Sequence, residues 1–228
     1  MNETLMKEML ENAVHFGHKA EKWNPKMRSY IYTKRDNIHI FDLRKTISYL
    51  EKACQFLKKA SSEKKVILYV STKPQCEKII KENAIKAEMP YVTGHWISGL
   101  LTNFETVKKR IKYLRDLKEQ ERTGEFEKYT KKEAQNLKKT IAKLELALGG
   151  VRDLQKIPHV LFILDTVIDA IAIREAKKLG IPIVAIVDSN SDPSQIQYPI
   201  PGNDDAIKSL HYLTEKITES IVEGKKLS

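Results

Sequence analysis

The chain has 228 residues, of which 41% are hydrophobic, so it can bury the core of one sizeable domain or of two small ones. Its only cysteines, Cys54 and Cys76, have no paired spacing, which excludes a disulfide framework or a thiolate zinc site and favours a reducing compartment. Its apolar runs fall well short of the roughly 20 residues of a membrane helix. Acids lie inside the apolar part of the N-terminus, so we expect a soluble protein without a signal peptide.

The net charge of +10 is concentrated in the first two thirds of the chain. Lys and Arg outnumber Asp and Glu by 31 to 19 in residues 1–148, whereas they are outnumbered by 11 to 9 in residues 151–228. A polarised basic surface attracts polyanions and gains affinity by releasing their counterions. Nucleic acid is therefore the leading candidate partner.

The first 60 residues predict two helices and a β-hairpin. Thr4 is suited to cap a helix from Leu5 to Phe16, and Gly17 is suited to the left-handed turn that ends it. SYIYT and IHIF, separated by KRDN, predict the hairpin. Asp42 then resembles the N-cap of an amphipathic helix over 43–60.

Strand and helix patterns alternate in the rest of the chain. The predicted strands are VILYV (66–70), MPYVT (89–93), HVLFIL (159–164) and IPIVAIV (181–187). The predicted helices are 76–86, 168–179 and 204–222, with Gly180 ending the second of them. Strands this apolar, alternating with helices, indicate a mostly parallel sheet covered on both faces. We expect a doubly wound α/β domain with a flavodoxin-like sheet.

An insertion at residues 104–148 interrupts this alternation. Apolar residues spaced three and four apart, from Phe104 to Leu114 and from Ala134 to Leu148, predict two helices that coil on each other. We expect an antiparallel helical hairpin inserted into an α/β core domain of residues 1–103 and 149–228. Its outward cations favour a nucleic-acid-docking arm, with a solvated helix face as the alternative; the candidates are Lys108, Lys109, Arg110 and Lys112.

Polar residues follow the predicted strands, where an open α/β sheet usually binds its ligand. They include STK (71–73), Asp165 and DSNSDP (188–193). An enzyme could use them with a metal and a phosphate, yet no glycine-rich phosphate loop follows VILYV, and Pro74 removes a backbone N–H there. No set of acid, base and nucleophile is recognisable. We therefore expect these residues to cap helices and close turns, and we predict no enzyme and no cofactor.

The stretch HFGHKAEKWNPKMRSYIY (15–32) has the composition of a nucleic-acid-binding surface. Cations can contact phosphates and an aromatic ring can stack on a base or sugar; the candidates are Lys19, Lys22, Trp23, Asn24, Lys26, Arg28, Lys34 and Arg35. Trp23 has an alternative, because it could fold back and close the core. The cations have no such alternative. His15 and His18 lie three apart, but no third ligand has a clear spacing, so we expect packing and no metal.

Six segments resemble, in order, the signatures of the bacterial-type S-two family of small ribosomal subunit proteins. They are HFGH (15–18), WNPKM (23–27), LLTNF (100–104), LGG (148–150), LGIPIVAIVDSNSDP (179–193) and IPGNDDAI (200–207). The resemblance covers nearly the whole chain and implies an α/β domain with a protruding helical hairpin. It also implies a structural function: binding small-subunit rRNA at the junction of head and body, and supporting the docking of the large mRNA-binding ribosomal protein.

The resemblance also implies the partners, which are small-subunit rRNA and neighbouring small-subunit proteins, with no membrane and no homo-oligomer. The implied location is a cytoplasmic ribosome, and an organellar ribosome is the alternative. The chain departs from the family pattern at His95, Ser98 and Pro74, so specific rRNA contacts there stay open. The competing classes are an adaptor that binds only proteins through its coiled coil, and a phosphate-ligand enzyme on a flavodoxin-like sheet.

Overall fold

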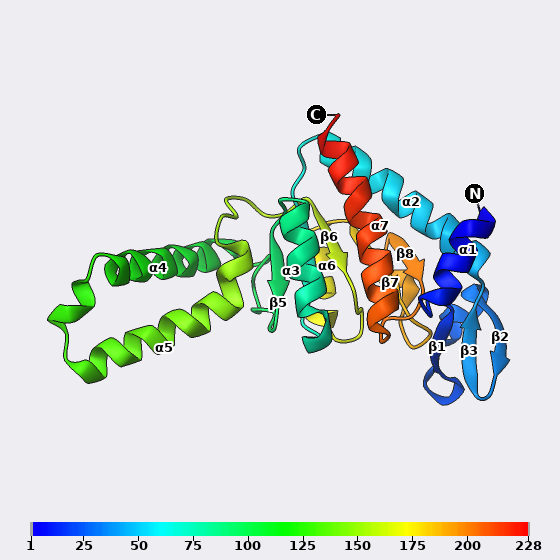
Figure 1. Ribbon diagram of the computed structural model, residues 1–228, viewed down its shortest axis with the longest axis horizontal. Helices are drawn as coiled ribbons and strands as arrows, with labels where there is room; N and C mark the ends of the chain where they lie inside the picture. The colour runs from blue at the N-terminus through cyan, green and yellow to red at the C-terminus, as the bar shows by residue number, and fades with distance from the viewer. Residues whose placement is uncertain (1, 228) are drawn as a thin grey trace.

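A five-stranded parallel sheet lies at the centre of the structure, a computed structural model that describes residues 2–227 (Figure 1). Its strands are β4 (Ile67–Ser71), β5 (Tyr91–Thr93), β6 (Val160–Ile163), β7 (Ile183–Val187) and β8 (Tyr198–Pro201). Their spatial order is β5-β4-β6-β7-β8, and every neighbouring pair is parallel. Counted along the chain this is the order 2-1-3-4-5 of flavodoxin-like sheets. The predicted doubly wound α/β fold is confirmed.

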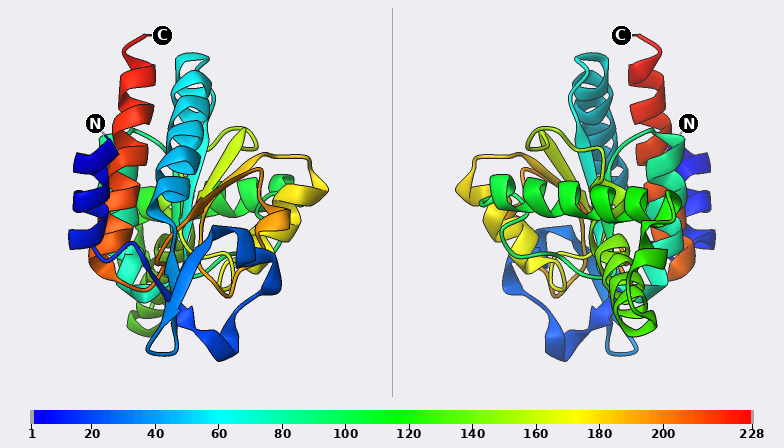
Figure 2. Two further views of the ribbon diagram at one scale, coloured as in Figure 1. Left: turned by 90° about the vertical axis from the view of Figure 1, so that its right-hand side faces the viewer. Right: turned by 90° about the vertical axis from the view of Figure 1, so that its left-hand side faces the viewer.

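Helices cover both faces of this sheet, because successive strand side chains point to opposite faces. The helices on one face are α2 (Leu43–Ser62), α3 (Glu77–Lys86) and α7 (Ile207–Lys225), and α6 (Ala170–Lys178) lies on the other (Figure 2). Tyr69 of β4 is buried with the first group, whereas its neighbours Leu68 and Val70 are buried with α6. Both faces of β4 are therefore apolar, as its sequence predicts.

Two of the predicted helix boundaries are confirmed. The Asp42 carboxylate accepts a hydrogen bond from the Arg44 backbone N–H at 3.1 Å and caps α2. Gly180 follows α6 with a φ of +68°, the left-handed conformation that ends a helix. Among residues 2–227, none of the helices combines the length and the apolar content needed to cross a membrane.

The first helix ends earlier than predicted. α1 spans Asn2–Glu11, because Ala13 takes a left-handed φ of +58° and the Val14 N–H then bonds the Met9 carbonyl at 3.0 Å. Gly17 therefore does not end a helix; it lies in a strand, β1 (Phe16–Lys19), which was not predicted. A Cβ on Gly17 would lie 2.9 Å from Ser189 Oγ, so glycine is needed there for a close approach and not for a turn.

The predicted hairpin is confirmed as β2 (Ile31–Arg35) and β3 (Ile38–Phe41). Asp36 and Asn37 connect the strands with φ values of +47° and +61°, as a type I′ turn requires. β1 pairs with the other edge of β3, which gives a small antiparallel sheet in the order β1-β3-β2. Lys19, Lys34 and Arg35 lie in the strands of this sheet, and the 3₁₀ turns between β1 and β2 carry the other candidate cations, Lys22, Lys26 and Arg28.

The predicted helical hairpin is also present, and it projects from one end of the molecule (Figure 1). Its helices are α4 (Phe104–Arg122) and α5 (Lys131–Leu148). Phe126 is buried in the turn between them, and Thr130 and Glu133 form a reciprocal capping box at the start of α5. The buried seam residues are Phe104, Val107, Ile111, Leu114 and Leu117 of α4, with Ile141 and Leu148 of α5.

Both edges of the large sheet are blocked. β8 was not predicted, because Pro199 and Pro201 argue against a central strand; it is instead an edge strand, where proline is tolerated. At the other edge, residues 149–151 lie against β5 so closely that a Cβ on Gly150 would be 2.2 Å from the Tyr91 carbonyl oxygen. This close approach to Tyr91 explains the second glycine of LGG, Gly150.

Candidate nucleic-acid interface

The carboxyl ends of β4 and β6, where the strand order reverses, hold a buried lysine among carboxylates. Lys73 Nζ lies 3.1 Å from Asp165 Oδ2, 3.6 Å from Asp204 Oδ1 and 2.6 Å from Asp205 Oδ1. It also donates to the Asp204 carbonyl oxygen at 2.7 Å. Burial lowers the pKa of Lys73, but these carboxylates outweigh it and the net shift is upward, so the ammonium stays charged. The lysine is thus committed to partners within the chain at the usual ligand position of such a sheet.

The other polar residues at this edge close turns, as predicted. The Asp165 carboxylate accepts hydrogen bonds from the backbone N–H groups of Val167 and Ile168, both at 2.9 Å. Asp169 accepts from the Thr72 hydroxyl at 2.8 Å, and burial raises the pKa of Asp169 to about 6. The Asp165 bonds close the turn that follows β6, and the Asp169 bond joins the start of α6 to the end of β4, so both roles are architectural.

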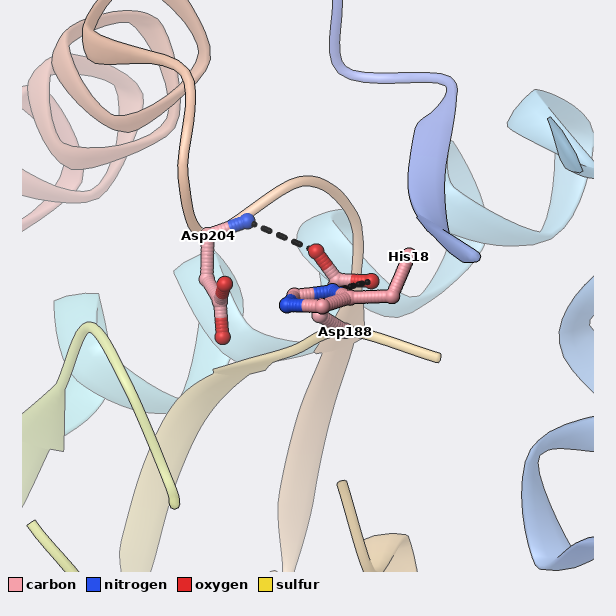
Figure 3. A group of neighbouring side chains, drawn as sticks. All are labelled: His18, Asp188 and Asp204. Carbon is pink, nitrogen blue, oxygen red and sulfur yellow. Dashed lines mark hydrogen bonds and ion pairs between the residues drawn. The ribbon is translucent and has the colours of Figure 1, made fainter. Parts of the chain in front are cut away.

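His18, Asp188 and Asp204 form a cluster beside the lysine (Figure 3). His18 Nδ1 lies 3.1 Å from Asp188 Oδ1, and this carboxylate raises the pKa of His18 to about 9. Within the described residues, neither carboxylate oxygen of Asp204 has a hydrogen-bond partner, and burial raises the pKa of Asp204 to about 8. The burial and the neighbouring carboxylates both disfavour a charged Asp204.

One nitrogen and two carboxylate oxygens of this cluster lie within 4.8 Å of one another, so the three residues could hold a divalent cation. Spacing in the sequence offered no third ligand for His18, and the structure brings Asp188 and Asp204 to it from the other end of the chain. The absence of a bound metal stays a prediction. His15 behaves as expected, since its ring packs on Phe16 with centroids 4.0 Å apart. Burial lowers the pKa of His15.

The segment DSNSDP fixes the N-terminal stretch to the core. Ser189 accepts hydrogen bonds from the backbone N–H of His18 at 2.8 Å, through its hydroxyl, and of Asn24 at 2.7 Å, through its carbonyl. Lys26 Nζ donates to Asp192 Oδ2 at 2.8 Å and to Ser194 Oγ at 2.9 Å. Two segments that lie far apart in the sequence therefore form one structural unit, and the role of DSNSDP is to anchor the N-terminal stretch.

We expect Asp188→Asn to lower the free energy of unfolding by about 1 to 3 kcal/mol. Asp188 pairs with His18 and also accepts from the backbone N–H groups of Ser189 and Asp204, and an amide keeps only one acceptor oxygen for these donors. Urea unfolding measures the change. Asp153→Asn is the matched control, because the Asp153 side chain is exposed; equal effects of the two substitutions would contradict the architectural role of Asp188.

Some of the predicted nucleic-acid-binding residues of the N-terminal stretch are exposed, whereas others already contact other residues of the chain. Lys19, Lys22 and Arg28 are exposed, as are Lys34 and Arg35 on β2. We call these five cations the N-terminal basic surface.

Three residues of the stretch already have partners within the chain. Lys26 is bound to Asp192, so the expectation that every cation lacks an alternative role is wrong for it. The Asn24 side chain accepts from the Lys26 backbone N–H at 3.0 Å and caps a 3₁₀ turn at Pro25–Tyr30. Trp23 is half-buried, and its ring lies 5.0 Å from that of His39 on β3. Part of the Trp23 ring is therefore packed on the protein and part is exposed.

The second predicted group lies on the arm. Lys108, Lys109, Arg110 and Lys112 are all exposed on α4, and none of the four makes an ion pair with any residue from 2 to 227. Along the long axis of the molecule, α4 lies on one side of the central sheet and β1–β3 lie on the other (Figure 1). The candidate residues thus form two separated basic groups.

A flavodoxin-like sheet whose ligand edge is filled by its own ion pairs, with exposed cations on either side, defines a basic α/β protein suited to binding a polyanion. Residues 9–224 match the family described as Ribosomal protein S2. The chain is 50% identical to the small ribosomal subunit protein uS2 of a Nitratiruptor species over 97% of this chain and 83% of that protein. It is 48% identical to that of Dictyoglomus thermophilum, over 100% and 92%. The chain belongs to the ribosomal protein S2 family, whose members are structural proteins of the small ribosomal subunit and not enzymes.

Proposed function

We propose that this chain is a structural constituent of the small ribosomal subunit that binds small-subunit rRNA at the junction of head and body. In this proposal the α/β core of residues 1–103 and 149–228 and the arm of residues 104–148 each contribute a basic surface. The chain also supports docking of the large mRNA-binding ribosomal protein, and it acts as a single copy among neighbouring proteins. A cytoplasmic ribosome is the proposed location. The observation that carries the proposal is the pair of separated groups of exposed cations.

The N-terminal basic surface is suited to phosphate binding because a rigid scaffold holds its cations. Lys34 pairs across the hairpin with His39, and Arg35 with Ile38, beside a tight type I′ turn. Arg35 Nε is 3.7 Å from Asp36 Oδ2, but the two side chains are 83% and 90% exposed, so this ion pair is weak. Because the backbone that carries these cations is already ordered, contact with a phosphate backbone costs only side-chain freedom.

Trp23 supports the same proposal in a limited way. A ring packed on one side against His39 is already ordered, and its remaining exposed part is available to a base or a ribose. Asn24, bound to the Lys26 backbone, orders the loop that carries this ring. We therefore assign rRNA contact to Trp23 and a positioning role to Asn24 and Lys26.

We expect the double substitution Lys22→Gln and Lys34→Gln to weaken binding to small-subunit rRNA and to reduce the slope of log affinity against log salt by about two, one for each lost phosphate contact. Filter binding with the transcribed rRNA over a salt series measures both quantities. Lys177→Gln with Lys178→Gln is the matched control, because both lysines are exposed on α6, away from the N-terminal basic surface.

A double variant that binds with the affinity and slope of the control would contradict an rRNA role for the N-terminal basic surface. A wild-type chain that binds small-subunit rRNA no more tightly than an unrelated RNA of equal length would overturn the proposed function as a whole. Tight association with ribosomal proteins alone would then favour the protein-binding adaptor. Lys26→Gln is informative beside these variants, since loss of its bond to Asp192 is expected to lower the stability of the free protein as well.

A further inference from the structure

A small basic pocket lies at the base of the arm, between α4 and the loop that follows α5. Its volume is about 300 Å³, the lower end of the range for small-molecule sites. Ile111 and Leu154 supply the apolar part of its lining, and both are buried. Glu105 is the single acid that lines it. The cations that line it are Lys108, Lys109, Lys112, Arg115 and Arg152.

The positive charge of this pocket is not neutralised within the described chain. None of its three lysines makes an ion pair with a residue between 2 and 227. Arg115 donates to the carbonyl oxygen of Arg152 at 3.0 Å, which ties α4 to the loop without compensating either charge. Arg152 pairs with Asp153 at 3.3 Å, but these side chains are 64% and 83% exposed, so the pair contributes little. Five cations therefore surround one cavity with one acid among them.

The cations reach the pocket from two parts of the chain. Lys108, Lys112 and Arg115 are spaced four and three apart on α4, so they lie on one face of that helix. Arg152 comes from the connection between α5 and the core strand β6. Arg110, on the same helix, does not line the pocket. The cations that line the pocket therefore differ from the candidates predicted from the sequence: Arg115 and Arg152 are added and Arg110 is left out.

We propose that this pocket, which we call the neck pocket, binds the sugar–phosphate backbone of small-subunit rRNA and so fastens the arm to the core. Guanidinium and ammonium groups are the phosphate ligands of proteins, and a guanidinium can bind two phosphate oxygens at once. The apolar lining suits the carbon face of a ribose. The inference rests on the proposed function, because rRNA is the polyanion that the chain is proposed to bind.

If two pocket residues bind the same ligand, the effects of replacing them on rRNA affinity are coupled. The effects of replacing independent surface residues are not coupled. If Lys112 and Arg152 hold the same phosphate-bearing unit, loss of either one removes much of what the other contributes. Their effects on affinity would then not multiply, as is usual for residues that act through one partner. Residues that contact separate phosphates act independently, and their fold-losses multiply.

The test is a double-mutant cycle with the full chain and transcribed small-subunit rRNA, read by filter binding over a salt series. The variants are Lys112→Gln, Arg152→Gln and their combination. We expect each single variant to weaken binding several-fold and to lower the salt slope by about one, and the combination to lower the slope by about one and not two. The control cycle combines Arg110→Gln with Arg152→Gln, and there the fold-losses should multiply.

A second measurement does not depend on substitutions. Acetylation of lysines in the wild-type chain, with and without rRNA, should show protection of Lys108 and Lys112, with Lys131 and Lys132 at the start of α5 as exposed references. Equal protection of all four lysines would overturn the neck pocket. So would protection by ribosomal proteins in the absence of rRNA, which would make the ligand an acidic protein surface.

The outcomes separate this inference from the proposed function. Multiplying losses in the Lys112 and Arg152 cycle, or no loss at all, overturn the neck pocket while specific binding of rRNA by the wild-type chain leaves the proposed function standing. Absence of specific wild-type binding overturns both. Urea unfolding of each variant verifies that it is folded, and all three substituted side chains are exposed.

Discussion

Replacement of Glu175 by alanine is expected to lower the free energy of unfolding by about 3 to 5 kcal/mol, because several buried donors lose one shared acceptor. This buried carboxylate on α6 accepts from Trp96 Nε1 at 3.1 Å and from the backbone N–H groups of Gly99 at 2.7 Å, Leu101 at 3.0 Å and Thr102 at 3.1 Å. The Thr102 hydroxyl donates to it as well, at 3.1 Å. These donors all belong to the loop that leads into α4, so Glu175 also sets where the arm begins.

Urea unfolding checks this expectation, with Glu219→Ala as the control at an exposed position. Limited proteolysis of the loop 94–103 reports the local effect, because the loop should open before the core unfolds. A loss no larger than that of the Glu219 variant would contradict the proposed role of Glu175. The loss of stability in Glu175→Gln should lie between those of Glu175→Ala and Glu219→Ala, since the glutamine amide retains one acceptor oxygen.

The same residue gives a pH dependence of known sign. Burial tends to raise the pKa of Glu175, but the hydrogen bonds from Trp96 and the loop outweigh it, and the pKa is lowered from its ordinary value of 4.5. A carboxyl group whose pKa is lower in the folded state stabilises the protein above its unfolded pKa, and this contribution is lost as pH falls through the folded pKa. The wild-type chain should therefore lose more stability below about pH 4.5 than Glu175→Gln does.

Replacement of Lys73 by methionine should cost about 3 to 5 kcal/mol of stability, the usual effect of removing one partner from a buried ion pair. The ammonium is the shared cation of Asp165, Asp204 and Asp205, and without it the buried Asp165 carboxylate loses its ion-pair partner. Urea unfolding measures the loss, and Lys78→Met, at an exposed position, is the control.

A second substitution tests whether electrostatics cause this loss. Adding Asp165→Asn to Lys73→Met should recover part of the stability, because it removes the stranded charge while the amide oxygen can still accept from the backbone N–H groups of Val167 and Ile168. If the double variant is less stable than Lys73→Met alone, the lysine acts through packing and not through its charge.

Much of the fold was predictable because the local sequence pattern of most helices and strands indicates their type. Continuous apolar runs such as VILYV and IPIVAIV predicted buried parallel strands, and spacings of three and four predicted α4 and α5. The elements that were missed depend on distant contacts. β1 pairs with β3 and passes close to Ser189, an approach that Gly17 permits, and β8 lies at a sheet edge, where its two prolines are tolerated.

Charge and position in the sequence were enough to propose candidate rRNA contacts, which stay predictions, whereas the pairing of charges at the sheet edge could not be predicted. The cations of the N-terminal basic surface and of the arm follow from composition and position. The partners of Lys73 do not, because Asp165 and Asp205 lie 92 and 132 residues away in the sequence. A signal was nevertheless present: Asp188 and Asp205 belong to the segments DSNSDP and IPGNDDAI, which the family resemblance had marked without giving them a purpose.

The prolines of β8 also affect how readily the unassembled chain aggregates. Gly202 donates its N–H to the Val187 carbonyl of β7 at 3.1 Å, so the N–H groups of alternate residues point inward and positions 199 and 201 face outward. Pro199 and Pro201 have no N–H to present there. A newly made chain, which must wait for its assembly partners, therefore offers no row of hydrogen-bond donors on which another copy could add a strand and start an aggregate.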